Sequence, residues 1–412
     1  MIHGSSALQK FQLSMDQLAK WGAVVLLLGA PTSIALVNVA TLLIVIGWLF
    51  SGNFRWKWEV IRYNPITLPS LMLFGLVLIG IAYTEARPEY INRHLYVYSR
   101  LLLMLMLLTL LFESKWQRRA LIAFAVGSLI TLVSTYVNIW WHVPWSDSNN
   151  QGLGVTHNVF NDHIAQGLAM SFFVVLAVFY ALSEKSWGVK AGWMLVILLA
   201  IFSITHLLQG RTGQVVLLVM LPAILLVAAP VRWRWHFLAL LILLLVLAFA
   251  SSPLLLQRFA VGLDEFNRYL DGDMSLTSIG ARLDMWRISI DMFLDSPWWG
   301  HGTGSYRMQA ELIYVDPVVC ATSCIHPHNQ FLFFGVEYGI IGILTYAWLL
   351  QRSAAHALQC EIQARILLVG FLSVMLVSSF INGPLWVTTE RNFFTAVLPL
   401  LMAGWRMQSA LR

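Results

Sequence analysis

The chain has 412 residues, of which 58% are hydrophobic and only 11% are charged. A soluble domain carries roughly 25% charged residues, so this composition excludes an ordinary soluble protein and indicates a chain built for lipid. The formal net charge of +6 comes without a run of Lys and Arg long enough to form a basic stripe, which excludes nucleic acid as a partner.

Apolar stretches of roughly 18 to 20 residues predict about twelve transmembrane helices. The apolar run from Trp21 to Phe50 is too long for the core of a signal peptide, so we expect it to stay in the membrane uncleaved. Only Pro31 and its neighbours separate two helices within that run, and a re-entrant kink is the alternative. The predicted helices lie near residues 14–31, 33–51, 66–83, 95–112, 119–140, 163–182, 189–207, 211–229, 235–252, 328–350, 363–381 and 389–406.

Positive charge predicts the orientation of these helices, because short cytoplasmic loops are enriched in Lys and Arg. With a cytoplasmic N-terminus, 16 of the 26 Lys and Arg residues, including every Lys, fall on the cytoplasmic side. The opposite orientation would export all of them. We therefore expect both termini in the cytoplasm and the long segment 253–327 on the outer side of the membrane.

The basic residues left on the outer side are all arginines. A guanidinium group binds phosphate or carboxylate through parallel hydrogen bonds, so this face is predicted to recognise such anions. The alternative for any single arginine is an ion pair with a nearby acid, such as Asp264, Asp284, Asp291 or Glu390. The outer arginines are Arg87, Arg93, Arg100, Arg211, Arg258, Arg268, Arg282, Arg287, Arg307 and Arg391.

The outer segment 253–327 divides the chain into nine predicted helices in 1–252 and three in 328–412. Connections of this length are usually functional. We see no repeat and no separate soluble domain, so the loop and the membrane helices are expected to build one functional unit.

A stripe of apolar residues inside this segment predicts an amphipathic helix that lies on the membrane surface. Its members are Leu283, Trp286, Ile290 and Phe293, at helical spacing. The helix should end at Ser296, because a proline follows. Residues 300–304 (GHGTG) resemble a phosphate loop only superficially, since no strand precedes them, and we expect a flexible turn there.

The strongest local signal lies where the long segment re-enters the membrane. Its polar residues are Cys320, Cys324, His326, His328 and Asn329. In an oxidising outer compartment the two cysteines are expected to form a disulfide, and free thiols or a zinc site shared with the histidines are the alternatives. Cys360, on the cytoplasmic side, should remain a thiol.

A histidine at the mouth of a helix is most often an interfacial hydrogen-bonding residue. An unperturbed pKa of about 6.5, however, leaves His326 and His328 largely neutral at pH 7, as a general base must be. Arg211 opens a predicted helix in the run QGRTGQ. The N-terminus of a helix is already partly positive, so an anion is expected beside this arginine.

Two charged residues lie deeper in the predicted helices. Arg100 is more than a turn inside its helix, where it either faces a cavity or extends to the outer surface. Glu337 lies about 180° round the helix from His328 and should pair within the bundle instead of sharing the face of that histidine.

His328 and Asn329, followed after nine residues by Gly339 and then by Gly342, resemble the signature of the O-antigen ligase family. In that family the signature follows a large outer loop in a protein of about twelve spans. Arg211 in QGRTGQ and Arg282 in GARLDMW stand where such ligases carry functional arginines. The resemblance covers nearly the whole chain.

The resemblance implies an all-α, GT-C-like membrane protein of the bacterial inner membrane, with its site facing the periplasm. It implies an inverting glycosyltransferase of lipopolysaccharide biosynthesis that needs neither metal nor cofactor. The enzyme would move a glycan from undecaprenyl pyrophosphate to a sugar hydroxyl of lipid A-core. His328 would be the general base, and Arg211 and Arg282 would hold the pyrophosphate. The candidate supporting residues are His326, Asn329, Arg287 and Arg100.

Other functions remain open at this stage. O-antigen polymerases and protein O-oligosaccharyltransferases use the same lipid donor. A transporter or lipid flippase is the alternative from another class, and it would place several polar groups in the middle of the membrane. Only Glu337 and Arg100 lie deep in this chain, which favours the enzyme.

Overall fold

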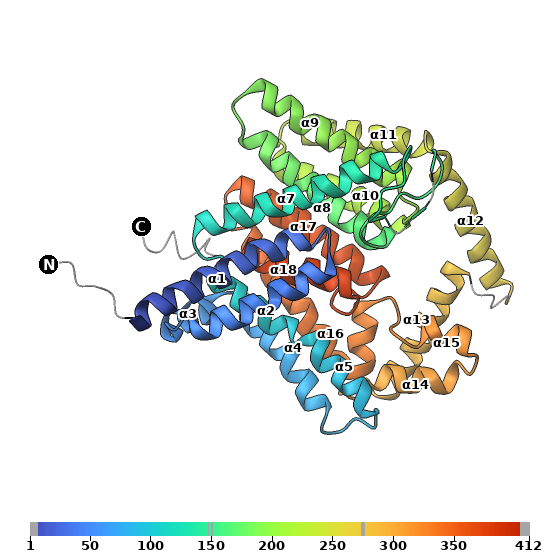
Figure 1. The fold of residues 1–412 in the computed structure, drawn as a ribbon. Coiled ribbons are helices and arrows are strands. Elements are labelled where there is room, and N and C mark those ends of the chain that lie inside the picture. The colour runs from blue at the N-terminus through green and yellow to red at the C-terminus, as the bar shows by residue number, and fades with distance from the viewer. Residues whose placement is uncertain (1–6, 147, 150, 273–276, 404–412) are drawn as a thin grey trace.

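A computed structural model describes residues 7–403 except 147, 150 and 273–276, and Figure 1 shows them as an assembly of helices without a strand. The first half contains α1 (Ala7–Gly29), α2 (Ile34–Phe50), α3 (Phe54–Tyr63), α4 (Thr67–Gly80), α5 (Pro88–Tyr98), α6 (Arg100–Leu110), α7 (Ser114–Val137), α8 (His163–Ser183) and α9 (Trp187–Phe202), which the π-helical turn η1 (Ser203–Leu207) extends. The second half contains α10 (Arg211–Ala228), α11 (Arg234–Ala250), α12 (Pro253–Leu270), α13 (Ser278–Asp295), α14 (Ser305–Ile313), α15 (Pro317–Ser323), α16 (Gln330–Ala357), α17 (Ile362–Ile381) and α18 (Thr388–Met402).

Each of the twelve stretches predicted to cross the membrane contains a helix. Among the described residues, seven helices are long and apolar enough to span a bilayer, or up to nine if each of two bent pairs counts as one span. The protein is therefore a multi-pass membrane protein, whereas the predicted number of about twelve spans is not confirmed. The last residues of the predicted span 389–406, with Arg406 and Arg412, lie outside the described part of the chain.

The first two helices form an antiparallel hairpin and not a kinked single helix. Small residues let them approach closely: a methyl group on Gly47 would lie 2.6 Å from the carbonyl oxygen of Met15, and one on Gly22 would lie 3.0 Å from the side chain of Ile44. At the turn, Ser33 caps α2 by accepting from the backbone N–H of Leu36 at 3.3 Å. The boundary predicted at Pro31 is therefore correct.

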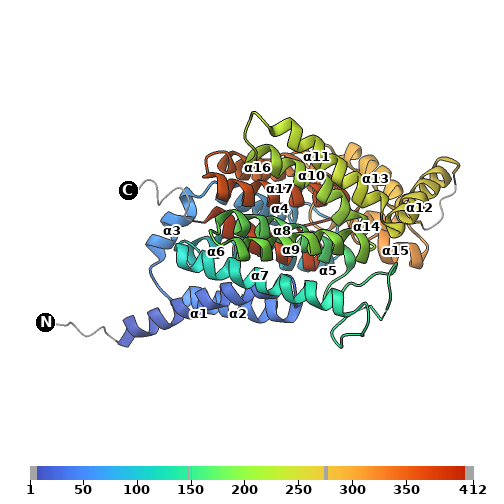
Figure 2. The ribbon, with the colours of Figure 1, turned by 90° about the horizontal axis from the view of Figure 1, so that it is seen from above.

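The helices run between two ends of the molecule, as Figures 1 and 2 show from perpendicular directions. The beginning of α1 and the end of α18 lie at one end, and α12 to α15 gather at the other, which we call the loop end. Between them, buried aromatic rings from α7, α8, α17 and α18 form a core, in which the centroid of Phe172 lies 5.5 Å from that of Phe371 and 5.9 Å from that of Phe393.

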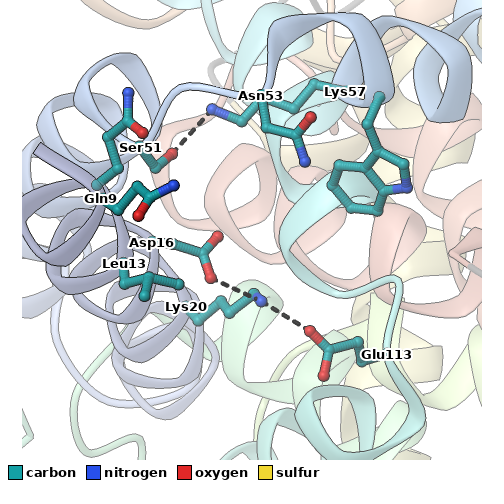
Figure 3. Close-up of a pocket in the computed structure, with 10 residues that line it drawn as sticks. Gln9, Leu13, Asp16, Lys20, Ser51, Asn53, Lys57 and Glu113 are labelled. Atoms are coloured by element: carbon teal, nitrogen blue, oxygen red, sulfur yellow. Dashed lines mark hydrogen bonds and ion pairs between the residues drawn. The ribbon is translucent and has the colours of Figure 1, made fainter. Parts of the chain in front are cut away.

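A pocket of about 550 Å³ opens at the end opposite the loop end (Figure 3). Its charged groups already have partners. Lys20 bridges Asp16 at 2.8 Å and Glu113 at 2.7 Å, while Lys57 donates to Ser51 Oγ at 2.8 Å. The pocket therefore ties α1, α3 and the start of α7 together through these contacts.

The long segment folds into α12 to α15. α12 bends by 84° away from α11, so the chain turns at the loop end instead of continuing as one rod. The helix predicted from the apolar stripe exists as α13, and it ends with Ser296 as its C-cap. Its buried face, however, consists of Met285, Ile288, Ser289 and Met292. The predicted apolar stripe lies on a neighbouring face, where Ile290 is 45% exposed, while α13 packs on α16 through its buried face. The placement of this helix on the membrane surface stays a prediction.

Residues 300–304 do not form a flexible turn. Gly300, Gly302 and Gly304 have positive φ, and the segment is held against α16. The N–H of Gly302 donates to the carbonyl of Glu337 at 2.9 Å, and Thr303 Oγ1 donates to the carbonyl of Val77 at 2.7 Å. These buried bonds, invisible in the sequence, make the turn a fixed support for α16.

Candidate functional site

The site begins where the chain passes from the loop into α16. Asn329 is the N-cap of that helix: its Oδ1 accepts from the N–H groups of Phe331 and Leu332, both at 3.0 Å. Its Nδ2 donates to the carbonyl of Phe380 at 3.2 Å. An N-cap of this kind stabilises a helix by about 1 kcal/mol. Asn329 therefore positions the start of α16, and the residue before it is His328.

His328 is fixed by a chain of hydrogen bonds to α17 and α18. Its Nδ1 lies 2.9 Å from Oδ1 of Asn382, and Nδ2 of Asn382 donates to Oε1 of Glu390. Ser378 Oγ donates to the other carboxylate oxygen of Glu390 at 2.7 Å. With Nδ2 of Asn382 donating to Glu390, Oδ1 of the same amide faces His328 and accepts there. Nδ1 of His328 therefore carries the proton, and Nε2 is left as the basic nitrogen.

His326 holds the backbone of His328. Its Nδ1 accepts from the N–H of His328 at 3.0 Å, and the two ring centroids lie 4.2 Å apart. His328 has a φ of 50°, an uncommon conformation for a residue with a side chain. The bond from His326 stabilises this conformation of His328.

Both imidazoles are neutral at pH 7. Burial and the guanidinium of Arg282 lower the pKa of His328 to about 4. Burial, His328 and Arg282 hold the pKa of His326 well below its usual range. Arg282 is thus close enough to influence both rings electrostatically.

Three arginines from separate helices line one cavity at the loop end. The cavity has a volume of about 180 Å³. Arg211 is the first residue of α10, Arg258 lies on α12 and Arg282 lies on α13. The other lining residues are His163, Ile164, Gln209, Thr212 and Ser278, so no carboxylate lines the cavity.

The arginines of this cavity are only weakly neutralised. Nη1 of Arg211 has no hydrogen-bond partner, and the nearest acidic atom to it is Oε2 of Glu265 at 3.5 Å. Arg258 donates to the neutral side chain of Gln209. Burial and the neighbouring Arg211 lower the pKa of Arg282. Concentrated positive charge of this kind favours a bound anion.

Two arginines predicted to support the site lie outside this cavity. Arg287 faces away on α13, where it pairs with Asp284 at 2.9 Å and with Asp291 at 3.9 Å. Arg100 donates to Thr41 and, at 3.1 Å, to Oδ1 of Asn38, both on α2. The structure thus assigns Arg287 to the ion pairs that were the alternative, and it attaches Arg100 to a neighbouring helix.

The glycines of the signature shape α16. Gly339 interrupts the helix with a φ of 62°, and the N–H of the next residue, Ile340, donates to the carbonyl of Pro297 at 2.8 Å. A methyl group on Gly339 would lie 2.4 Å from the backbone of Trp298. The predicted pairing of Glu337 within the bundle is confirmed: its Oε1 lies 2.7 Å from Nε2 of His94, and both side chains are buried.

Cys320 and Cys324 form a disulfide in the structure, beside the approach to His326. Their sulfurs are therefore not available as zinc ligands. No group of three His, Cys, Asp or Glu side chains suited to a metal ion occurs in the described part of the chain. The thiol of Cys360 donates to the carbonyl of His356 at 3.3 Å.

Residues 196–347 match the sequence model of the family described as O-antigen ligase. The matched segment is less than half of the 412 residues, and it is this segment that resembles the O-antigen ligase family. The matched segment contains all three cavity arginines, the long loop, His326 and His328. No curated protein matches the chain.

Among solved structures, this chain is similar to a chain from a study described as structural coordination of polymerization and crosslinking by a peptidoglycan synthase complex. The sequence identity is 16% and the TM-score is 0.45. The similarity covers 84% of this chain and 96% of the other.

Sequence analysis missed two residues of the site. Asn382 follows His328 by 54 positions and belongs to no motif, so no local signal could have linked it to the histidine. Arg258 was one of the ten outer arginines, but no role was assigned to it. Only the packing of α12 beside α10 and α13 brings it to the cavity.

Proposed function

We propose that this protein is a ligase that transfers a glycan from undecaprenyl pyrophosphate to a sugar hydroxyl of lipid A-core. The observation that carries the proposal is a carboxylate-free cavity lined by Arg211, Arg258 and Arg282, with the last of these in electrostatic range of the neutral His328. A pyrophosphate needs positive charge, and an acceptor hydroxyl needs a base. The site supplies both within one end of the bundle.

His328 acts as the general base in this proposal. Its Nε2, free because Nδ1 is bonded to Asn382, takes the proton of the acceptor hydroxyl as that oxygen attacks the anomeric carbon. The new carbon–oxygen bond forms as the bond to the pyrophosphate breaks. Attack from the face opposite the leaving group inverts the anomeric configuration, and the lipid pyrophosphate departs with the bonding electron pair.

The arginines stabilise the negative charge that grows on the departing pyrophosphate. Arg211 stands at the N-terminus of α10, where the backbone N–H groups add to its positive charge. Three guanidinium groups supply the charge that a divalent cation would otherwise bring, so we propose that transfer is independent of metal. Bound pyrophosphate would also offset the effect of Arg282 and so raise the pKa of His328, making it a stronger base once the donor is present.

The proposed sidedness follows from the distribution of charge. The Lys-rich end that contains Lys20, Lys57 and Lys115 is opposite the loop end, so the positive-inside rule favours a cytoplasmic location for the former and a periplasmic location for the site. An O-antigen is attached to a lipid in the inner membrane, which agrees with this placement.

A polymerase or a protein O-oligosaccharyltransferase would use the same donor cavity, so the acceptor decides between them. The test offers purified protein a lipid-linked glycan with lipid A-core, with a second lipid-linked glycan, or with an acceptor protein. A product on lipid A-core alone supports the ligase. A lengthened lipid-linked glycan would instead indicate a polymerase. A modified protein would indicate a protein O-oligosaccharyltransferase. Movement of the lipid-linked glycan across the membrane of proteoliposomes, without transfer of the glycan to any acceptor, would favour a flippase.

A further inference from the structure

A second group of arginines lies outside the cavity of Arg211. Arg93 on α5, Arg100 on α6 and Arg391 on α18 form this second arginine cluster, which shares no residue with the cavity of Arg211. The guanidinium carbons of Arg93 and Arg391 each lie 5.8 Å from the ring centre of Tyr96, and Arg391 feels the charges of both Arg93 and Arg100.

The charge of this cluster is uncompensated. Arg100 donates to the neutral side chains of Thr41 and Asn38, and Arg391 donates to the carbonyl of Trp386 at 2.9 Å. No Asp or Glu lies within 4.0 Å of any of the three arginines in the part of the chain that the structure describes.

Burial makes this arrangement costly without a ligand. Arg100 is only 6% exposed and Arg391 only 1%, and Nε of Arg391 has no hydrogen-bond partner. Buried charges are normally paired, because removing a lone charge from water costs several kcal/mol. Arg93 and Tyr96, in contrast, are exposed at the surface, so an anion can reach the cluster there.

The cluster is joined to the catalytic histidine by a short segment of chain. Trp386, which accepts from Arg391, lies four residues after Asn382, the partner of His328. Glu390 and Arg391 are adjacent in the chain but have different partners. Glu390 accepts a hydrogen bond from Asn382, whereas Arg391 belongs to the second arginine cluster. The second arginine cluster is therefore connected to the support of His328 through residues 382–391, and it shares no residue with the donor cavity.

The surroundings indicate that this anion is part of a lipid. Asn38 and Thr41, which hold Arg100, lie on α2 together with Val39 and Leu42, whose side chains are 57% and 60% exposed. Such apolar residues on a membrane helix face lipid tails. A phosphate beside them at the membrane surface would belong to a lipid headgroup.

We propose that the second arginine cluster binds a phosphate group of the glycolipid acceptor, so that donor and acceptor phosphates occupy two separate arginine sites. This inference rests on the proposed function, since it assigns the cluster to the acceptor of that reaction. Arg93 contacts the phosphate, while the buried charges of Arg100 and Arg391 strengthen the attraction.

Binding to the purified full chain tests the site without requiring turnover. The probes are lipid A with its phosphates, the same lipid after dephosphorylation, and phosphatidylglycerol. We expect Arg93→Gln to weaken binding of phosphorylated lipid A roughly tenfold, the effect of one charged hydrogen bond, and to leave binding of the dephosphorylated lipid unchanged. The matched control is Arg87→Gln, since Arg87 precedes the same helix but already lies 3.7 Å from Glu89 and from Glu311.

Equal binding of phosphorylated and dephosphorylated lipid by the wild type would overturn the inference. So would a loss in Arg93→Gln that is just as large for phosphatidylglycerol, because the cluster would then serve bulk lipid. In transfer assays, we expect the KM for acceptor to rise about tenfold in Arg93→Gln with kcat and the donor KM unchanged, and Arg93→Lys to recover part of the loss. Phosphate-dependent binding without any transfer by the wild type would support the site and refute the proposed reaction.

Discussion

Nδ1 of His328 lies 2.9 Å from Oδ1 of Asn382, whose amide nitrogen is bonded in turn to Glu390. This relationship determines which nitrogen of the imidazole is basic. A carboxylate two positions away in the chain of hydrogen bonds orients the amide, and the amide orients the ring. The arrangement resembles the way an acid orients a catalytic histidine in hydrolases, with an asparagine inserted between them.

Removal of the base should therefore cost more than removal of its orienting partner. We expect His328→Ala to lower kcat by about 10²- to 10⁴-fold, since a positioned base contributes that much. Asn382→Ala keeps His328 but removes the hydrogen bond that selects its tautomer. We therefore expect a smaller loss of about tenfold to a hundredfold in kcat, with donor binding unchanged. Single-turnover transfer, normalised to folded protein, measures both. Near-normal turnover by His328→Ala would remove it as the base and leave His326 as the candidate.

Substitution of the cavity arginines should reduce transfer for a different reason, because it removes the charge that stabilises the departing pyrophosphate. We expect Arg211→Ala and Arg282→Ala to reduce transfer by 10²- to 10³-fold each if each acts like one oxyanion donor, about 3 to 4 kcal/mol. Lysine should restore little, because a point charge cannot form the bidentate contact. Arg258→Ala should behave in the same way, as it lines the same cavity.

A suitable control for these variants is Arg268→Gln, because Arg268 is exposed and paired with Asp264 at 3.0 Å. Its transfer rate should stay near that of the wild type. If the cavity variants were also to transfer at the normal rate, the leaving-group site would have to lie elsewhere.

The pH dependence of transfer should reflect the depressed pKa of His328. Because the pKa lies near 4 in the free protein, the base stays neutral as the pH falls through 6.5, and kcat/KM should decline only as the pH approaches about 4. Arg282→Gln removes one cause of the depression, so the acid limb of its residual activity should move to higher pH. A wild-type inflection at pH 6.5 would contradict this environment for His328.

Substitution at the bend of α16 should destabilise the protein without touching the chemistry. Gly339→Ala places a methyl group 2.4 Å from the backbone of Trp298 at a positive φ, so we expect a loss of more than about 1 kcal/mol in stability. Gly75→Ala is the matched control: no atom lies within 4 Å of the added methyl group, and alanine favours a helix by about 0.5–1 kcal/mol. Thermal unfolding in detergent compares the two, and equal stability would refute the role of the bend.

The predicted orientation places α12 to α15 in the periplasm. An alkaline phosphatase inserted at Asp271, after α12, should therefore be active, since the reporter folds only outside the cytoplasm. A second insertion at Ser186, before α9, should be inactive. An inactive reporter at Asp271 with an active one at Ser186 would place the site in the cytoplasm and exclude a periplasmic acceptor.

Hydropathy located a helix in every predicted stretch because a membrane span must satisfy its own backbone hydrogen bonds over a continuous apolar run, which is a local property. The same reasoning placed Arg211 at the start of α10 and ended α13 at Ser296, since caps and proline act over a few residues. The motif around His328 was equally local. The buried face of α13 was not, because its partner α16 lies across the fold.

Only the tertiary structure decided which partners the charged groups have. The sequence did not decide which of the ten outer arginines pair with acids. Packing placed three of them in a cavity without carboxylates, Arg287 in an exposed pair with Asp284, and others in a cluster around the buried Arg391. It also brought Asn382 to His328 across 54 residues. Electrostatic interactions depend on distance in space and on burial, and the order of residues along the chain specifies neither.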